Sequence, residues 1–159
     1  MTRFANKAVL VTGGTRGIGA AITKAFLAEG ARVAINGRTS ASTADAMVDL
    51  KGAIAAPGDV STVAGCEAAV GTALTAFGGL DVLVNNAGIF ERGTVEETSE
   101  EMWDAVMNAN VKSILFCTRA ALPSLRSAKG TIVNIASESG LNGYPETTAY
   151  CASKGAAVN

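Results

Sequence analysis

The chain has 159 residues, of which 48% are hydrophobic and 17% are charged, and its formal charge is -1. These values predict one globular domain, residues 1–159, and exclude a disordered chain or a basic surface for nucleic acid or anionic lipid. Histidine is absent. A Ser-His-Asp triad, a Cys-His pair and a histidine-ligated metal are therefore excluded, and acid–base chemistry near pH 7 has to use Tyr, Lys, Cys or carboxylates. No metal site is expected.

Short β-branched runs alternate with longer helix-like segments. The pattern predicts strands at 8–12, 32–36, 53–56, 81–85 and 131–135. It predicts helices at 18–29, 42–50, 63–77 and 99–122, the last of them closed by Pro123, and a final helix from about Thr148. Nearly apolar strands separated by helices indicate a parallel sheet covered on both faces. Right-handed crossovers then give a doubly wound α/β (Rossmann) fold with strand order 3-2-1-4-5.

The end of the sequence carries a helix pattern that runs to Asn159 without a capping glycine or a returning strand. The fifth predicted strand is then expected to be an uncovered apolar sheet edge. This pattern predicts a C-terminally incomplete domain.

Three cysteines, Cys66, Cys117 and Cys151, are far apart and form no CxxC motif. This spacing argues against a structural zinc or a disulfide framework and favours a reducing compartment, the cytoplasm. The N-terminus has no long apolar stretch and is not expected to be a signal peptide. The longest charge-free run, 68–80, is shorter than the roughly 20 residues needed to span a bilayer, so no membrane partner is expected.

A glycine-rich loop follows the first predicted strand, with Gly13, Gly17 and Gly19 at the spacing G-x-x-x-G-x-G. Glycine allows a sharp turn and brings backbone N–H groups against a pyrophosphate, and the N-terminus of the following helix adds its positive dipole end. Because the loop lies between a strand and a helix, it predicts a dinucleotide site. The alternative is tight strand–helix packing without a ligand.

The end of the second predicted strand bears on which nucleotide is bound. An NAD site carries an acidic residue there for the ribose 2′-hydroxyl, whereas positions 36–39 contain no carboxylate. Arg38 can make a bidentate contact with a 2′-phosphate, and Arg16 adds a second positive charge. NADP(H) is therefore favoured over NAD(H). The alternative is that Arg38 is a solvated surface residue.

Tyr150 and Lys154 are four residues apart, which puts both on one face of the last predicted helix. A free tyrosine has a pKa of about 10, and a nearby ammonium favours the phenolate. Without histidine, this pair is the best acid–base candidate in the chain. A pair on a solvated helix surface is the alternative.

Ser137 and Asn110 are further polar candidates. Ser137 follows the fifth predicted strand, at the edge of the sheet where ligands bind, so its hydroxyl can bond a substrate carbonyl; a turn or cap serine is the alternative. Asn110 lies on an apolar stripe of the long predicted helix, where an amide is costly unless it is satisfied. It is either a buried structural residue or the holder of a water or carbonyl in a proton relay toward Lys154.

Taken together, these motifs resemble the short-chain dehydrogenase/reductase family in its NADP-preferring form, from Arg3 to Asn159. Segment 12–19 is similar to the family's coenzyme loop, 85–88 to its Asn-Asn-Ala-Gly motif, and 59–60 to the pair that meets the adenine ring. The tetrad of the family falls on Asn110, Ser137, Tyr150 and Lys154. The resemblance implies coenzyme contacts from Gly13, Thr15, Arg16, Gly17, Ile18, Gly19, Arg38, Asp59, Val60, Asn86, Ala87, Gly88, Tyr150 and Lys154.

The resemblance also implies a mechanism. Tyr150 is the general acid for carbonyl reduction and the base for alcohol oxidation, and Lys154 favours its phenolate and binds the nicotinamide ribose. Ser137 orients the substrate oxygen, Asn110 keeps a water against Lys154, and hydride passes between NADP(H) and the substrate carbon. The partner is a small carbonyl or alcohol compound, with an apolar pocket mouth expected from Ile89, Phe90, Leu141 and Tyr144.

Members of the family continue past the position of Asn159 with further strands, so the resemblance implies that the C-terminal strands are absent from this chain and that the segment alone has little activity. Members also commonly form dimers or tetramers, so a homodimer or homotetramer is expected for the complete protein. A different function is also open, because a fold alone does not imply catalysis. A non-catalytic NADP(H)-binding sensor or regulatory protein would use the same fold, but it has no need for the whole tetrad.

Overall fold

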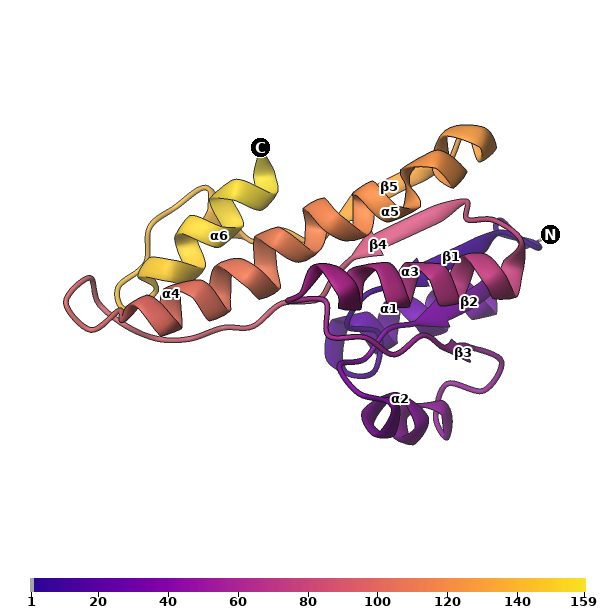
Figure 1. Cartoon of the computed structure of the whole chain (residues 1–159), viewed down its shortest axis with the longest axis horizontal. Coiled ribbons are helices and arrows are strands. Elements are labelled where there is room, and N and C mark those ends of the chain that lie inside the picture. The colour runs from indigo at the N-terminus through magenta and orange to yellow at the C-terminus, as the bar shows by residue number, and fades with distance from the viewer. Residues whose placement is uncertain (1) are drawn as a thin grey trace.

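Five parallel strands form one sheet in the order β3-β2-β1-β4-β5 (Figure 1). The computed structural model describes residues 2–159. Its strands are β1 (Ala8–Val11), β2 (Arg32–Ile35), β3 (Ile54–Ala55), β4 (Val82–Asn85) and β5 (Thr131–Asn134). The strand order and the parallel pairing of every neighbour confirm the predicted topology.

Helices cover the sheet on both faces. They are α1 (Gly17–Ala28), α2 (Ser40–Met47), α3 (Val63–Phe77), α4 (Glu100–Met107), α5 (Ser113–Ala128) and α6 (Thr148–Val158), with a π-helical turn at Asn108–Lys112 and a 3-10 turn at Glu138–Gly140. The α3 and α5 helices pack on one face and α1 and α2 on the other, which confirms the doubly wound α/β fold. In Figure 1, α6 lies beside α4, away from the β1–β2–β3 side of the sheet.

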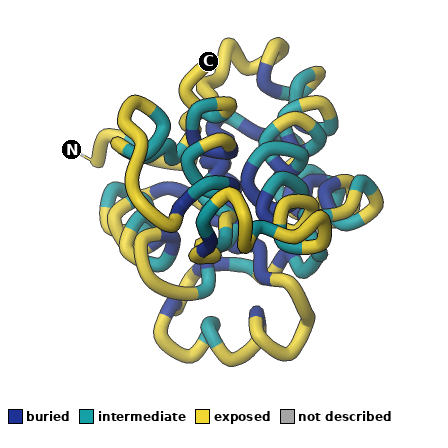
Figure 2. Tube along the Cα trace, turned by 90° about the vertical axis from the view of Figure 1, so that its left-hand side faces the viewer, coloured by how far each residue is buried: buried dark blue, intermediate teal, exposed yellow. Residues whose placement is uncertain are grey.

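The hydrophobic core consists of two layers, because successive strand residues point to opposite faces. Leu10 and Leu83 pack toward α3 and α5, whereas Val9 and Val11 pack toward α1 and α2. All four side chains are fully buried. Figure 2 shows the buried stretches gathered in the interior and the exposed stretches on the outside.

The ends of α3 show how local sequence fixes an element. Thr62 precedes the helix, and its hydroxyl accepts a hydrogen bond from Gly65 N at 3.0 Å. Gly78 ends the helix in the left-handed region, with φ 75°. Both ends of this helix lie at the predicted residues, 63 and 77.

An ion pair joins the start of β1 to the residue that precedes β4. Lys7 Nζ donates to one carboxylate oxygen of Asp81 at 2.7 Å, and Ala8 N donates to the other at 2.9 Å. The hydrogen bond from Lys7 is the main cause that lowers the pKa of Asp81. These bonds tie together the first residues of two neighbouring strands.

The prediction that Pro123 ends the long helix is wrong, because Pro123 lies inside α5, which continues to Ala128. Proline removes a backbone donor and normally disfavours a helix interior. Here the next turn is held by tertiary contacts, since Leu125 is buried in the core and Ser124 Oγ accepts a hydrogen bond from Leu80 N at 2.8 Å. Pro123 itself is exposed.

The single helix predicted for 99–122 is also interrupted. Ser99 caps its start, where its hydroxyl accepts a hydrogen bond from Met102 N at 3.2 Å. The π-helical turn at Asn108–Lys112 then separates α4 from α5. Periodicity alone gives no indication of such a turn, which contains the predicted site residue Asn110.

The β5 strand forms one side of the sheet. It pairs with β4, and within residues 2–159 no strand lies on its other side. All four of its residues are exposed, including Ile132 and Val133. The expectation of an uncovered apolar edge is therefore confirmed for the described part of the chain.

Candidate active site

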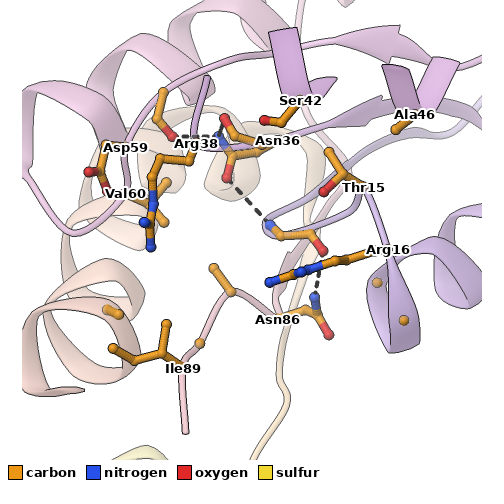
Figure 3. A pocket seen from close by; sticks show the side chains of 18 of the residues that line it. Thr15, Arg16, Asn36, Arg38, Ser42, Ala46, Asp59, Val60, Asn86 and Ile89 are labelled. Atoms are coloured by element: carbon orange, nitrogen blue, oxygen red, sulfur yellow. Dashed lines mark hydrogen bonds between the residues drawn. The ribbon is translucent and has the colours of Figure 1, made fainter. Parts of the chain in front are cut away.

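A cleft of about 880 Å³ lies at the carboxyl ends of β1, β2 and β4. Its walls come from the glycine loop, from the segments that follow β2, β3 and β4, and from the start of α2 (Figure 3). The structure brings together here the predicted coenzyme residues Gly13, Thr15, Arg16, Gly17, Ile18, Gly19, Arg38, Asp59, Val60, Asn86, Ala87 and Gly88. Tyr150 and Lys154 are not among the residues that line it.

The glycine loop depends on the absence of side chains at two positions. Gly13 has φ 60°, in the left-handed region that favours glycine. A Cβ on Gly19 would collide with the carbonyl of Gly13 and lie 2.6 Å from Nδ2 of Asn86. The loop and the first turn of α1 are therefore packed backbone against backbone, which leaves the N–H groups at the start of α1 facing the cleft.

The N-terminus of α1 has no side chain that caps it. Arg16 is the N-cap residue and has extended backbone angles, but its side chain accepts no hydrogen bond from the helix. The first N–H groups of a helix lack intrahelical partners and carry the positive end of its dipole. A Cβ on Gly17 would meet no atom within 4 Å, so the space outside the helix start is open. This combination fits the pyrophosphate of a dinucleotide.

Thr12 and Asn86 tie the glycine loop to the segment after β4. Thr12 Oγ1 accepts hydrogen bonds from the backbone N–H groups of Asn86 and Ala87, both at 3.0 Å. Asn86 Nδ2 donates to the carbonyl oxygens of Thr12 at 2.9 Å and Gly13 at 3.1 Å. Two separate loops therefore form one wall of the cleft with a fixed geometry.

Two guanidinium groups face the cleft. Figure 3 shows Arg16 and Arg38 reaching from different segments into the same cavity. Asp59 lies on the same wall as Arg38, and its carboxylate accepts hydrogen bonds from Ser61 Oγ at 2.7 Å and Ser61 N at 3.0 Å. The bond from the Ser61 hydroxyl is the largest cause that lowers the pKa of Asp59, and the charge of Arg38 acts in the same direction.

Asn36 is a structural residue of the cleft that sequence reasoning missed. It is buried, and its Nδ2 lies within hydrogen-bond distance of the carbonyl oxygens of Ala56 at 3.0 Å, Gly58 at 2.9 Å and Gly37 at 3.3 Å. Its Oδ1 accepts a hydrogen bond from Gly13 N at 3.4 Å. The amide therefore joins the glycine loop to the segments that follow β2 and β3. Its position just after an apolar strand was the available sequence signal.

Tyr150 and Lys154 lie on one face of α6, as predicted. Lys154 Nζ is 5.8 Å from the centre of the Tyr150 ring and donates a hydrogen bond to the carbonyl oxygen of Ile135 at 2.7 Å. Lys154 is only 6% exposed, and this burial lowers the pKa of its ammonium. Within residues 2–159, no hydrogen bond is seen for the Tyr150 hydroxyl, and the residue is partly exposed.

Ser137 starts the 3-10 turn that packs against α6. Its Oγ accepts a hydrogen bond from Ser139 N at 3.2 Å, so it is a cap serine, but its hydroxyl hydrogen has no acceptor in the described part of the chain. A Cβ on Gly140, at the end of this turn, would lie 2.5 Å from the carbonyl oxygen of Lys154. The turn that carries Ser137 is thus packed closely on the helix of the Tyr-Lys pair.

Asn110 is buried in the π-helical turn, and its amide is occupied by protein partners. Oδ1 accepts from Ile89 N at 2.8 Å, and Nδ2 donates to Ile89 O at 3.0 Å and to Ser153 Oγ at 2.9 Å. The side chain reaches α6 through Ser153, whereas the ammonium of Lys154 bonds elsewhere. Of the two alternatives left open by the sequence, the geometry of the side chain matches a buried structural residue.

The apolar residues expected at the pocket mouth have mixed positions. Phe90 packs edge-on against the Tyr150 ring, with 4.8 Å between the centroids and an interplanar angle of 82°. Ile89 lines the cleft. Leu141 and Tyr144 are exposed in the loop that leads to α6.

The doubly wound sheet, the glycine-loop cleft and the adjacent tyrosine helix define a Rossmann-type α/β protein. The family model described as short chain dehydrogenase matches residues 7–159. The chain belongs to this family, which confirms the resemblance seen in its sequence motifs.

The helices of residues 2–159 were also compared with the length and apolar character that a membrane span requires, and none of them meets both.

Several relatives carry dehydrogenase names. The chain is 43% identical to 2-(S)-hydroxypropyl-CoM dehydrogenase 3 of Xanthobacter autotrophicus, over 99% of this chain and 64% of the relative. It is 40% identical to meso-2,3-butanediol dehydrogenase of Serratia marcescens, over 99% of this chain and 63% of the relative. The chain therefore spans about three-fifths of the length of these curated relatives.

A solved structure from Sinorhizobium meliloti 1021, assigned to the short-chain alcohol dehydrogenases, superimposes with a TM-score of 0.91 at 35% identity. The match covers 96% of this chain and 63% of that one. The fold of this chain is therefore also seen in an experimentally determined structure.

Proposed function

We propose that the protein is an NADP(H)-dependent oxidoreductase that transfers a hydride between the coenzyme and a carbonyl or secondary-alcohol substrate. The observation that carries this proposal is the pairing of Tyr150 with the buried ammonium of Lys154 on α6, a helix that the Asn110 amide links to the cleft-lining residue Ile89. Dehydrogenase names among the relatives support the same class of reaction. The domain, residues 1–159, carries both the cleft and the tyrosine helix.

Two features of the cleft support the proposed preference for NADP(H) over NAD(H). Arg16 and Arg38 bring two positive charges to its walls, and guanidinium groups bind phosphate through paired hydrogen bonds. Asn36 occupies a position after β2 where an NAD site would carry a carboxylate, and its amide is committed to backbone carbonyls. We therefore assign the 2′-phosphate to the region between Arg38 and the start of α2.

Proton transfer falls to Tyr150. When bound, the nicotinamide coenzyme supplies or accepts the hydride. The Tyr150 hydroxyl gives its proton to the substrate oxygen during reduction and takes it back during oxidation. The ammonium of Lys154, held by Ile135 O, stabilises the negative charge that remains on the phenol oxygen.

Ser137 and Lys154 provide the polar contacts around the reacting groups. The hydroxyl hydrogen of Ser137 has no acceptor in residues 2–159 and can bond the substrate oxygen, while its Oγ accepts from Ser139 N. Lys154 is assigned to the ribose hydroxyls of the coenzyme as well. Asn110 is assigned to the tetrad, but its side chain contributes through Ile89 and Ser153 rather than through direct contact with Lys154.

The test is Tyr150→Phe in the full-length protein, assayed with NADPH and a panel of ketones and aldehydes. Turnover is expected to fall by at least about 10³-fold, because a residue that transfers the proton is lost, while NADPH affinity stays within twofold. Turnover that survives this change contradicts the mechanism. A wild-type protein that binds NADPH without reducing or oxidising any substrate would instead favour the sensor or regulatory alternative.

Two further parts of the proposal come from the family resemblance and from the cysteines. We propose that the complete protein is a homodimer or homotetramer, which sedimentation velocity at several concentrations would test. We also propose a cytoplasmic location, which the free thiols of Cys66, Cys117 and Cys151 support.

A further inference from the structure

A buried hydrogen-bond network joins the helix of Tyr150 to the rest of the site. Its centre is the amide of Asn110, which is 1% exposed and lies in the π-helical turn between α4 and α5. One end of the network is the backbone of Ile89, which Asn110 bonds at both its N–H and its carbonyl. The other end is the hydroxyl of Ser153, at 2.9 Å from Asn110 Nδ2.

Ser153 lies on α6 between Tyr150 and Lys154 and is completely buried, with 0% exposure. Its hydroxyl donates to the carbonyl oxygen of Tyr150 at 2.8 Å and accepts from the amide of Asn110. Because a hydroxyl has a single hydrogen, the direction of both bonds is fixed. The side chain therefore connects the backbone of Tyr150 to an element outside α6.

The Asn110 amide is also connected to the Tyr150 ring, through Ile89 and Phe90. Ile89 is followed by Phe90, whose ring packs edge-on against that of Tyr150. The other end of this loop is fixed by Gly93, whose N–H donates to Glu146 O at 2.9 Å and whose carbonyl accepts from Thr148 N at 3.3 Å. Phe90 is thus carried by a loop that is anchored on both sides.

We infer that Ser153 is a positioning residue that sets the location of the Tyr150–Lys154 pair relative to the coenzyme cleft. Asn110 holds the cleft-lining residue Ile89 with one set of bonds and α6 with another, and Ser153 is its contact on α6. Ser153 touches no substrate in this arrangement. The inference rests on the proposed function, because its consequence is a change in turnover.

The experiment compares Ser153→Ala with Ser153→Thr in the full-length protein. Removal of the hydroxyl leaves Asn110 with one N–H unpaired and releases the carbonyl of Tyr150, so the tyrosine helix shifts or rotates. Small displacements of a catalytic group reduce turnover steeply. We expect kcat of Ser153→Ala to fall by about tenfold or more, with KM and the NADPH Kd within about twofold of wild type.

The conservative variants separate positioning from packing. Threonine keeps the hydroxyl and its bond along the helix, so Ser153→Thr is expected to recover most of kcat. Ser153→Cys keeps the size with weaker hydrogen bonds and is expected to lie between serine and alanine. If Ser153→Ala does not fold, the cysteine variant provides the same comparison.

Ser124→Ala is the matched control. The hydroxyl oxygen of Ser124 also accepts a hydrogen bond from a backbone N–H of another segment, that of Leu80 at 2.8 Å, but it lies far along α5 from the tyrosine. Its loss is expected to lower the melting temperature by a similar amount and to leave kcat within twofold. A drop in kcat for this variant equal to that of Ser153→Ala would mean that general loosening explains both.

The outcomes distinguish this inference from the proposed function. A wild-type protein without turnover, or one whose Tyr150→Phe variant stays active, overturns the proposed function itself. A wild-type protein that is active and depends on Tyr150, together with Ser153→Ala at wild-type kcat, overturns only the positioning role. Ser153→Thr that keeps the wild-type melting temperature but is as inactive as Ser153→Ala does the same, because the added methyl group is then tolerated and the hydroxyl is not the relevant feature.

Discussion

Arg38 is predicted to determine the preference for NADPH over NADH. The two coenzymes differ only in the 2′-phosphate, and Arg38 lies on the wall of the cleft next to the start of α2. Arg38→Ala removes this guanidinium and leaves the glycine loop, Asn86 and the helix start unchanged. The affinity for NADPH is therefore expected to fall, while the affinity for NADH stays the same.

The size of the effect follows from the contact and its exposure. A hydrogen bond to a charged partner contributes about 1.5–3 kcal/mol, and Arg38 is exposed, so we take a value of about 2 kcal/mol. This corresponds to an increase of about 30-fold in the NADPH Kd. Arg16 remains in the cleft, so some preference for NADPH is expected to survive in the variant.

The assay is calorimetric or fluorescence titration of the full-length protein with NADPH and NADH at two salt concentrations. Arg32→Ala is the matched control, because it removes one arginine charge from the opposite end of β2. The Arg32 guanidinium lies 5.0 Å from the centre of the Phe77 ring there. Only Arg38→Ala is expected to change the ratio of the two dissociation constants and to reduce the salt dependence of NADPH binding. A ratio unchanged in Arg38→Ala refutes the reasoning.

Three further predictions concern stability. Asn36→Asp is expected to lower the free energy of unfolding by at least about 3 kcal/mol in urea titrations, because a buried carboxylate would face carbonyl oxygens that now receive N–H groups; equal stability would contradict the assigned amide orientation. Gly65→Ala is expected to lower the melting temperature, since its Cβ would collide with the carbonyl of Asp59, whereas Gly71→Ala on the same helix meets no atom within 4 Å and is expected to add about 0.5–1 kcal/mol. Asp81→Asn is expected to cost about 1 kcal/mol or less at pH 7. Because the hydrogen bond from Lys7 lowers the pKa of Asp81 below the usual 3.8, the wild type loses this contribution as the pH falls through that lowered pKa, and the variant is expected to show a flatter stability profile below about pH 4.

The fold was predictable where short-range signals and burial agree. The strands are apolar because both faces of the sheet are covered, and α3 begins and ends at the residues where Thr62 and Gly78 predict it. Pro123 misled the prediction because contacts distant in sequence, at Leu125 and Ser124, hold the turn that follows it. The π-helical turn could not be predicted from the sequence either, because it depends on the hydrogen-bond partners of the Asn110 amide.

The site was predictable at the level of residue types rather than of bonds. Glycine spacing and the positions of Arg38 and Tyr150 follow from strand ends and helical periodicity. In the structure the glycines and Arg38 line the cleft and Tyr150 lies on α6, whereas their roles in binding and catalysis stay predictions. The role of Asn36 was not predicted, because the available signal, an asparagine after a strand, does not show which carbonyl groups surround its amide. The sequence also gave no indication of a role for Ser153, because its contacts form only in the folded chain.

The two halves of the site rest on different kinds of interaction, and this difference determines how each responds to change. The coenzyme cleft is formed largely by backbone groups, at Gly19 and at the bonds of Asn86, so its shape tolerates little added volume. The tyrosine half is placed by side chains, through Asn110 and Ser153, over elements that share few backbone hydrogen bonds with the sheet. Variants of the first half are therefore expected to change coenzyme affinity, whereas variants of the second half change turnover at constant affinity. Ile89 lines the cleft and its backbone is bonded to Asn110, which also bonds α6, so under the proposed function these bonds connect the region that binds coenzyme to the region that transfers the proton.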